Sequence, residues 1–232
     1  MTPSQLRNDR LLGRGRHRIR WIGAAALLVA LVVGLVSLAG RIRLAAEGYV
    51  YGYSLVMMDL TERAFVAVRG PTNTLVHSRD FPDASFRAVV RPNVDTLYSV
   101  AWFDLADGPQ VFQVPATDRY YVMQFLDAWT NVFGSIGQRT TGAGAGVFLI
   151  AGPDWIGEVP LGVTLLRSPT RIVWLIGRIQ TNGVSDLDFV HHLQDQFRLR
   201  SLADFRADRA SAPPVWRPST RKPAAPLYEI GA

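Results

Sequence analysis

Hydrophobic residues dominate one long segment near the start of the chain. Residues 21–40 (WIGAAALLVALVVGLVSLAG) contain no charged side chain. At a rise of 1.5 Å per residue, twenty residues form a helix about 30 Å long, which matches the apolar core of a bilayer. The segment predicts a transmembrane anchor; the alternative is a cleaved signal peptide, with Ser37-Leu38-Ala39 at the cleavage site. The apolar run is longer than that of most signal peptides, which favours the anchor.

The pattern then becomes that of an amphipathic helix over 44–68. Apolar side chains recur there at intervals of three and four residues. They are Tyr49, Tyr53, Val56, Leu60 and Ala64. We expect this stripe to pack into the core of a domain rather than to stack on a ligand. Gly70-Pro71 ends the helix, and a loop-rich stretch follows.

Short hydrophobic runs separated by glycine and proline predict a series of β-strands. The predicted strands are 97–104, 111–114, 120–127, 147–150, 163–166 and 171–176. This spacing is typical of an antiparallel sandwich or barrel. A helix is predicted from 187 to about 199, and a second short helical stretch after Ser201. The predicted fold class is α+β and β-rich: a transmembrane helix, a helix packed on a sandwich-like or barrel-like sheet, and a C-terminal helix.

These elements divide the chain into four parts. A basic tail covers 1–20, the membrane anchor 21–40, a β-rich domain 44–205 and a proline-rich arm 206–232. The formal net charge is +6, and nearly all of it comes from arginines in the tail. Arginines on this side of the anchor predict a cytoplasmic tail and an extracytoplasmic domain. Because the rest of the chain is almost neutral, nucleic-acid binding is not supported.

Polar residues interrupt the predicted sheet at three places. At the first, Asn93 and Asp95 follow Pro92 and precede a strand. Their side chains either stabilise a turn or place a carboxylate in a pocket as an acid, a base or a cation ligand.

The second place is the end of the strand 120–127. Alternation puts Tyr121, Met123 and Phe125 on one face, and Asp127 ends the strand before Trp129 and Asn131. We expect Asp127 either to form a buried ion pair or to act in catalysis. The candidate partners for the ion pair are Arg119, Arg139 and Arg178.

The third place is the glycine-rich stretch 137–146, where backbone N–H groups could hold an anion. The spacing is not that of a dinucleotide-binding loop, and a strand follows instead of a helix, so a flexible hairpin loop is favoured.

Other common catalytic signatures are absent from the sequence. The chain contains no cysteine, which excludes disulfides and thiolate chemistry. His191 and His192 are adjacent, so they would point about 100° apart on a helix, and no metal site is predicted. Ser54, Ser99 and Ser135 lie in no recognisable nucleophile motif. The sequence leaves the cofactor unknown.

Several short motifs together resemble the bacterial family called domain of unknown function 1254. They are Tyr51-Gly52-Tyr53, Pro71-Thr72-Asn73 with His77, 91–99, Arg119-Tyr120-Tyr121, 127–133, 137–142, Gly152-Pro153 and 174–178. The resemblance covers roughly 49–202 and implies a β-rich fold with flanking helices, but no activity. Many members carry a second domain, of the family called domain of unknown function 1214. We hypothesise that a separate polypeptide carries that domain here and docks onto this one.

The leading functional hypothesis is a membrane-anchored module that binds a ligand or a partner protein in the cell envelope. The expected pocket combines polar groups with aromatic walls, a mixture that suits a sugar or another polar ring-bearing ligand. Its residues are Asn93, Asp95, Tyr98, Tyr121, Asp127, Trp129, Asn131 and Arg139. The alternative is a hydrolase that uses Asp95 and Asp127 as a carboxylate pair, which requires the two groups to lie about 5 to 10 Å apart. A third possibility is a purely structural role within a split two-domain assembly.

Overall fold

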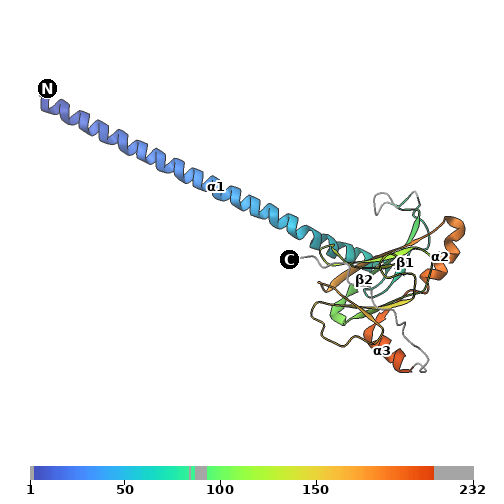
Figure 1. Cartoon of the computed structure of the whole chain (residues 1–232). Helices are drawn as coiled ribbons and strands as arrows, with labels where there is room; N and C mark the ends of the chain where they lie inside the picture. The colour runs from blue at the N-terminus through green and yellow to red at the C-terminus, as the bar shows by residue number, and fades with distance from the viewer. Residues whose placement is uncertain (1–2, 84, 87–92, 212–232) are drawn as a thin grey trace. The chain divides into compact units, whose positions relative to one another are not determined.

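The computed structural model describes residues 3–83, 85–86 and 93–211 of the chain (Figure 1). They belong to two compact units, 1–53 and 54–232. Helix α1 (Pro3–Arg69) is continuous and includes both the predicted anchor, 21–40, and the predicted amphipathic helix, 44–68. Arg41, Ile42 and Arg43 connect the two parts without a helix breaker. The part of α1 from Trp21 onward contains a stretch long and apolar enough to cross a membrane.

A five-stranded sheet, sheet A, forms one layer of the second unit. Its strand order is β1-β2-β8-β4-β5, and all neighbours are antiparallel. The strands are β1 (Val76–His77), β2 (Thr96–Asp104), β4 (Tyr121–Leu126), β5 (Val132–Gly137) and β8 (Ile172–Gln180). Because β2 and β4 both pair with β8, they run parallel to each other on either side of it.

A four-stranded sheet, sheet B, forms the second layer, in the order β7-β6-β3-β9. Its strands are β3 (Gln110–Val114), β6 (Gly146–Ala151), β7 (Thr164–Arg167) and β9 (Arg198–Ser201). The pairing of β6 with β7 is parallel and the others are antiparallel. The two sheets confirm the predicted β-rich α+β fold, but the strands described here close no barrel.

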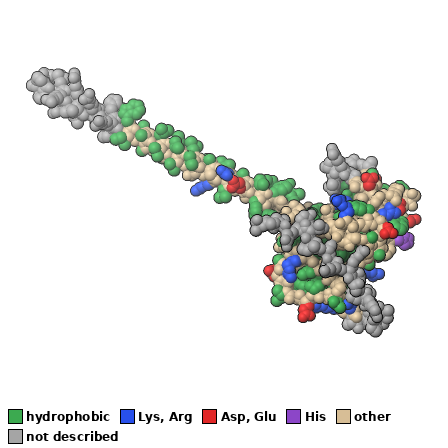
Figure 2. All heavy atoms as spheres, in the orientation of Figure 1, with side chains coloured by type: hydrophobic (Ala, Val, Ile, Leu, Met, Phe, Trp, Pro, Cys, Tyr) green, Lys and Arg blue, Asp and Glu red, His purple; other side chains and the backbone are tan. Residues whose placement is uncertain are grey.

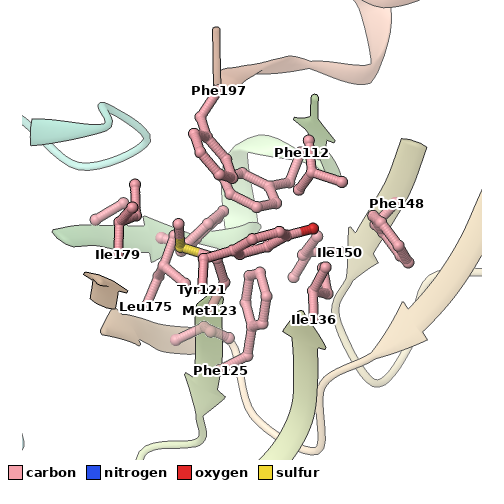
Figure 3. Packing of buried hydrophobic residues seen from close by; sticks show 14 of the residues in the cluster. Phe112, Tyr121, Met123, Phe125, Ile136, Phe148, Ile150, Leu175, Ile179 and Phe197 are labelled. Carbon is pink, nitrogen blue, oxygen red and sulfur yellow. The ribbon is translucent and has the colours of Figure 1, made fainter. Parts of the chain in front are cut away.

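The main core lies between the two sheets (Figure 3). Tyr121, Met123 and Phe125 point into it from β4, as the alternation predicted. Phe112 of sheet B packs edge-on against Phe125 of sheet A, with ring centroids 5.8 Å apart. Helix α2 (Leu187–Gln194) adds Val190 and Leu193 to this core.

A smaller core covers the other face of sheet B. Helix α3 (Leu202–Ser211) packs Leu202 and Phe205 against Val111 and Leu149 there. Two short 3-10 helices, η1 (Leu105–Asp107) and η2 (Val184–Asp186), connect the larger elements. Residues 206–211, which the predicted division assigned to the proline-rich arm, belong to α3. Residues 212–232 lie outside the described part.

Two helix predictions are wrong in detail. Helix α2 ends at Gln194 rather than near 199, because Arg198 to Ser201 pair with β3 as strand β9. The stripe on α1 is not part of a core: Tyr49 is 70% exposed, Val56 57% and Leu60 53%, whereas Met58 is buried. Figure 2 shows apolar side chains along the described part of α1.

Candidate functional site

The predicted pocket residues do not gather in one place. The backbone carbonyl of Asp95 accepts a hydrogen bond from Thr181 N, after the end of β8, at 2.9 Å. Asp127 follows Leu126, which pairs with Trp174 near the start of β8. Seven residues of extended strand separate Thr181 from Trp174, which corresponds to roughly 23 Å. This separation is far larger than the spacing of about 5 to 10 Å that the hydrolase hypothesis requires, so the predicted pairing of Asp95 with Asp127 is wrong.

Asn93 and Asp95 form a turn at the entrance to β2. Asn93 Oδ1 accepts hydrogen bonds from the backbone N–H groups of Asp95, at 2.6 Å, and Thr96, at 2.9 Å. The side chain of Asp95 is exposed. The turn interpretation of this motif is confirmed; Arg91 and Pro92 lie outside the described residues.

Asp127 organises the turn between β4 and β5. Its side chain is buried and accepts hydrogen bonds from Trp129 N at 2.8 Å, Asn131 N at 2.9 Å and Asn131 Nδ2 at 3.2 Å. Thr130, within the turn, has a φ of 70°. The expected ion pair with an arginine is wrong, because amide donors of the turn occupy the carboxylate.

The three arginines proposed as partners of Asp127 lie elsewhere. Arg119 forms an ion pair with Asp186 at 2.9 Å, in which both side chains are 15% exposed. Arg178 donates to Gln124 Oε1 at 3.1 Å and lies over the ring of Tyr98 on the outer face of sheet A. Arg139 is exposed in the turn after β5. These residues build separate contacts and no common pocket.

Tyr121 and the glycine-rich stretch also differ from expectation. The phenol of Tyr121 is buried in the core, and burial raises its pKa to about 12, so it stays protonated. The segment 138–145 is not a hairpin, because β5 belongs to sheet A and β6 to sheet B. It starts with a turn in which Gly137 O accepts hydrogen bonds from the N–H groups of Thr140, Thr141 and Gly142.

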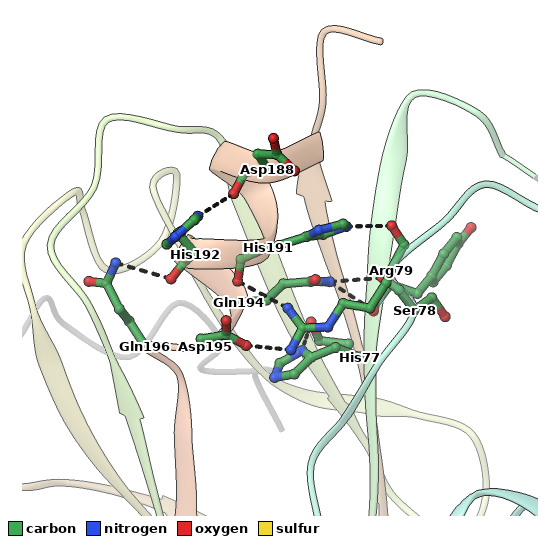
Figure 4. A network of polar contacts seen from close by, with 11 residues as sticks. His77, Ser78, Arg79, Asp188, His191, His192, Gln194, Asp195 and Gln196 are labelled. Carbon is green, nitrogen blue, oxygen red and sulfur yellow. Dashed lines mark hydrogen bonds and ion pairs between the residues drawn. The ribbon is translucent and has the colours of Figure 1, made fainter. Parts of the chain in front are cut away.

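A buried polar network joins helix α2 to the edge of sheet A (Figure 4). His77 Nδ1 lies 2.7 Å from Ser99 Oγ, and Ser99 is fully buried. Gln194 Nε2 donates to the backbone carbonyls of Ser78 at 3.1 Å and Tyr98 at 3.3 Å. Desolvation, followed by the positive charge of Arg79, lowers the pKa of His77 to about 4.

Arg79 extends the same network toward the surface. It donates to the backbone carbonyl of His191 at 3.0 Å and pairs with the carboxylate of Asp195. This hydrogen bond from Arg79 lowers the pKa of Asp195. A serine and a histidine in contact suggest a nucleophile and its base, but a fully buried Ser99 is closed to substrate. The arrangement acts as a clamp that holds α2 on the sheet.

A more accessible surface lies at the end of the sandwich where β8 begins. One depression, of about 360 Å³, is lined by the apolar residues Leu105, Pro109, Pro153 and Trp155, together with Arg171 and others. A second, of about 320 Å³, shares Arg171 and is mostly charged. Its lining includes Asp59, Glu62, Arg63 and Asp104.

Arg171 separates these two depressions and pairs with Asp104 at 3.3 Å. Burial, together with the nearby carboxylates of Asp104 and Asp59, raises the pKa of Glu62. No cluster of histidine and carboxylate groups suited to a metal ion occurs among the described residues. One side of Arg171 thus offers an apolar contact surface and the other side a polar one.

The loop 152–163 lines the apolar depression with its first four residues and carries exposed hydrophobic side chains beyond them. Ile156 is 99% exposed and Leu161 79%. Three arginines hold the backbone of the loop. Arg167 Nη1 donates to the carbonyls of Gly152, Pro153 and Trp155, Arg206 donates to Glu158 O, and Arg209 donates to Leu161 O. The loop therefore presents apolar side chains from a braced backbone.

The family model described as "Protein of unknown function (DUF1254)" matches residues 72–201. The chain belongs to this family. The match confirms the resemblance seen in the sequence motifs, and it includes the loop 152–163 and Arg171 within the DUF1254 domain. Among curated proteins, none matches this chain.

Solved structures resemble the DUF1254 chain over part of their length. The VPA0106 protein from Vibrio parahaemolyticus aligns with a TM-score of 0.55 and 26% identity, over 77% of this chain and 41% of its own. A putative uncharacterized protein from Burkholderia cenocepacia aligns with a TM-score of 0.35 and 14% identity, over 57% of this chain and 36% of its own. The chain thus spans less than half the length of these two proteins.

Proposed function

We propose that this protein is a single-pass membrane protein whose DUF1254 domain lies on the extracytoplasmic side and docks a second protein. The apolar part of α1 and the arginines that precede it support this topology. The observation that carries the docking proposal is the loop 152–163, where Ile156 and Leu161 project from the surface. Isolated exposed hydrophobic residues are common, but two of them on one braced loop beside an apolar depression are typical of a contact surface.

Three features make this surface suited to a protein rather than to a small ligand. Both depressions are partly open to solvent, so a small ligand bound there would not be fully surrounded. Strand β7 follows the loop directly and is an edge of sheet B, so its outer backbone groups can pair with another strand. The arginines that hold the loop reduce the entropy lost on binding, because the loop is already ordered.

The partner that we propose is a separate polypeptide carrying the companion domain of the family, domain of unknown function 1214. In VPA0106 the matched part makes up 41% of the chain, so there a similar fold occurs together with additional polypeptide. A separate chain would supply the corresponding contact here. Arg167, Arg206 and Arg209 each donate to a backbone carbonyl of the loop, so positive charge lies beside its apolar side chains. The matching surface is therefore expected to be apolar with an acidic rim.

The docking proposal is tested by capture from detergent-solubilised membranes. Wild-type protein is compared with the double variant Ile156→Asp/Leu161→Asp and with Val184→Asp, which changes an equally apolar side chain that is 76% exposed elsewhere. We expect wild type and Val184→Asp to retain a protein that contains the companion domain, and the double variant to lose it. If the double variant captures this protein as well as wild type does, or if wild type captures no such protein, the docking proposal is wrong.

The topology is tested separately, because the chain contains no native cysteine. A cysteine placed at Val184 should react with a membrane-impermeant maleimide in cells with an intact cytoplasmic membrane. A cysteine placed at Ser4, in the basic tail, should react only after that membrane is opened. The opposite pattern would reverse the proposed orientation.

A further inference from the structure

Helix α1 carries an apolar stripe that continues beyond 21–40 without a change of spacing. Successive positions alternate between intervals of four and three residues. They are Trp21, Ala25, Leu28, Val32, Leu35, Ala39, Ile42, Ala46, Tyr49, Tyr53, Val56 and Leu60. We call this set the α1 seam. The next position in the series is Arg63, which ends it.

The informative part of the seam is the section from Ile42 to Leu60. Within 21–40 nearly every residue is apolar, so any spacing would find hydrophobic side chains there. Beyond it charges return at Arg41, Arg43, Glu47 and Asp59, and none of them falls on the seam. A repeat of seven residues with two apolar positions is the pattern of a left-handed coiled coil.

The side chains of the seam are exposed in the single chain. Ile42 is 62% exposed, Tyr49 70%, Tyr53 49%, Val56 57% and Leu60 53%. Met58, by contrast, is 3% exposed. In the heptad it occupies the position opposite the seam, so its burial within the second unit leaves Val56 and Leu60 free to meet another helix.

We propose that two copies of this chain associate through the α1 seam as a parallel coiled coil. Two copies inserted in the same orientation bring identical residues of α1 opposite each other, so a self-complementary stripe is paired in register. The Arg43–Glu47 and Arg63–Asp59 ion pairs form within one helix, at 2.8 and 3.0 Å, and partly neutralise the charges beside the seam. This inference does not depend on the docking proposal.

The area available matches what a specific dimer requires. Five half-exposed seam residues between Ile42 and Leu60 can each bury on the order of 100 Å², or about 500 Å² per copy. The total of about 1,000 Å² reaches the lower limit for a biological interface. Small residues at Ala25 and Ala39 allow close approach of the helices within the apolar segment.

Cysteine cross-linking tests the seam directly, because the chain has no cysteine of its own. The experiment uses the full chain in the membrane. Single cysteines are introduced at Tyr49, Tyr53 and Val56 on the seam, and at Leu44 and Tyr51 as controls. The controls are both 71% exposed and lie on the opposite face of the helix. A disulfide requires Cβ atoms about 3.5 to 4.5 Å apart, so only facing positions form one efficiently.

We expect the seam variants to form a disulfide-linked dimer at least about fivefold faster than the control variants. Equal rates on both faces, or cross-links to a different protein, would overturn the proposal. A second measurement does not depend on introduced cysteines: the mass of the detergent-solubilised protein. Wild type and Tyr51→Glu should have the mass of a dimer. The double variant Tyr53→Glu/Val56→Glu should have the mass of a monomer. A monomeric wild type would also overturn the proposal.

Discussion

The imidazole of His77 and the hydroxyl of Ser99 form a hydrogen bond across β1 and β2, with Nδ1 2.7 Å from Oγ. This contact lies under the end of α2, where Gln194 binds the neighbouring backbone. Because burial and the charge of Arg79 lower the pKa of His77 to about 4, the imidazole is neutral at pH 7. The clamp on α2 therefore contains a group whose protonation opposes folding.

We predict that the protein loses stability in mild acid because of His77. Between pH 6.5 and about 4 the unfolded chain binds a proton at His77 that the folded protein does not bind. The free energy of unfolding should therefore fall as the pH is lowered through this window, by up to about 3 kcal/mol. Urea unfolding at pH 7.5 and pH 4.5, followed by tryptophan fluorescence, measures this change. His77→Gln should be less stable at pH 7.5 but should lose clearly less on acidification; an equal loss in both proteins would contradict the assignment.

A second prediction separates the two carboxylates that the sequence singled out. Asp127 is buried and accepts three amide hydrogen bonds, so Asp127→Ala should lower the free energy of unfolding by about 2 to 3 kcal/mol. Asp95 is exposed and contributes to the turn through its backbone, so Asp95→Ala should change it by less than about 0.5 kcal/mol. Chemical denaturation of both variants provides the comparison. Similar losses in the two variants would show that the side chain of Asp95 has a structural role that its exposure does not indicate.

Much of the fold could be predicted because hydrophobic alternation is a local property. The predicted strand 97–104 is observed as Thr96–Asp104, and 147–150 as Gly146–Ala151. The pattern does not predict strand β5, because Gly134, Ser135 and Gly137 interrupt its hydrophobic residues. The pattern places the start of strand β9 at the end of a helix, because only its pairing with β3 distinguishes it as a strand.

The candidate site could be predicted less well because it depends on strand order. Asp95 precedes β2 and Asp127 follows β4, and both strands lie beside β8, so the two carboxylates fall at opposite ends of sheet A. His77 and Ser99 are 22 positions apart, and only the pairing of β1 with β2 brings them together. The exposed loop 152–163 carries no sequence motif beyond Gly152-Pro153, so its surface could be found only in the structure.

A third prediction concerns Asn73, which covers the edge of β2. Its backbone N–H donates to Trp102 O at 2.6 Å, and its side-chain amide exchanges two hydrogen bonds of 3.2 Å with the backbone of Asp104. Its φ of 60° is unfavourable for residues other than glycine and asparagine. Asn73→Ala loses the hydrogen bonds of the side-chain amide and keeps the strained backbone. It should therefore lower the free energy of unfolding by about 2 to 3 kcal/mol.

Asn73→Gly separates the two contributions. Glycine also lacks the amide but accepts the positive φ. The glycine variant should therefore lose about 1 kcal/mol less of the free energy of unfolding than the alanine variant does. Thermal unfolding of both variants gives the order. A glycine variant that is less stable than the alanine variant would mean that the φ at this position contributes little.

The last prediction concerns Gly177, at the centre of β8. It pairs with Ser99 on one side and Met123 on the other. A Cβ atom at this position would lie 2.9 Å from Ser99 O and would collide with Met123 Sδ. Neither neighbour can move easily, because both Ser99 and Met123 are fully buried. Gly177→Ala should therefore lower the free energy of unfolding by about 1 to 3 kcal/mol or more.

Gly134 in β5 provides the matched control, because an added Cβ there would meet Leu166 at an ordinary 3.4 Å. Gly134→Ala should be close to neutral, or slightly stabilising through the restricted unfolded chain. Urea unfolding of the two variants under the same conditions decides the matter. A Gly177→Ala variant as stable as Gly134→Ala would mean that β2 shifts at Ser99 to accommodate the added methyl group. The contact of Ser99 with His77, and with it the clamp on α2, would then be weaker than the distances indicate.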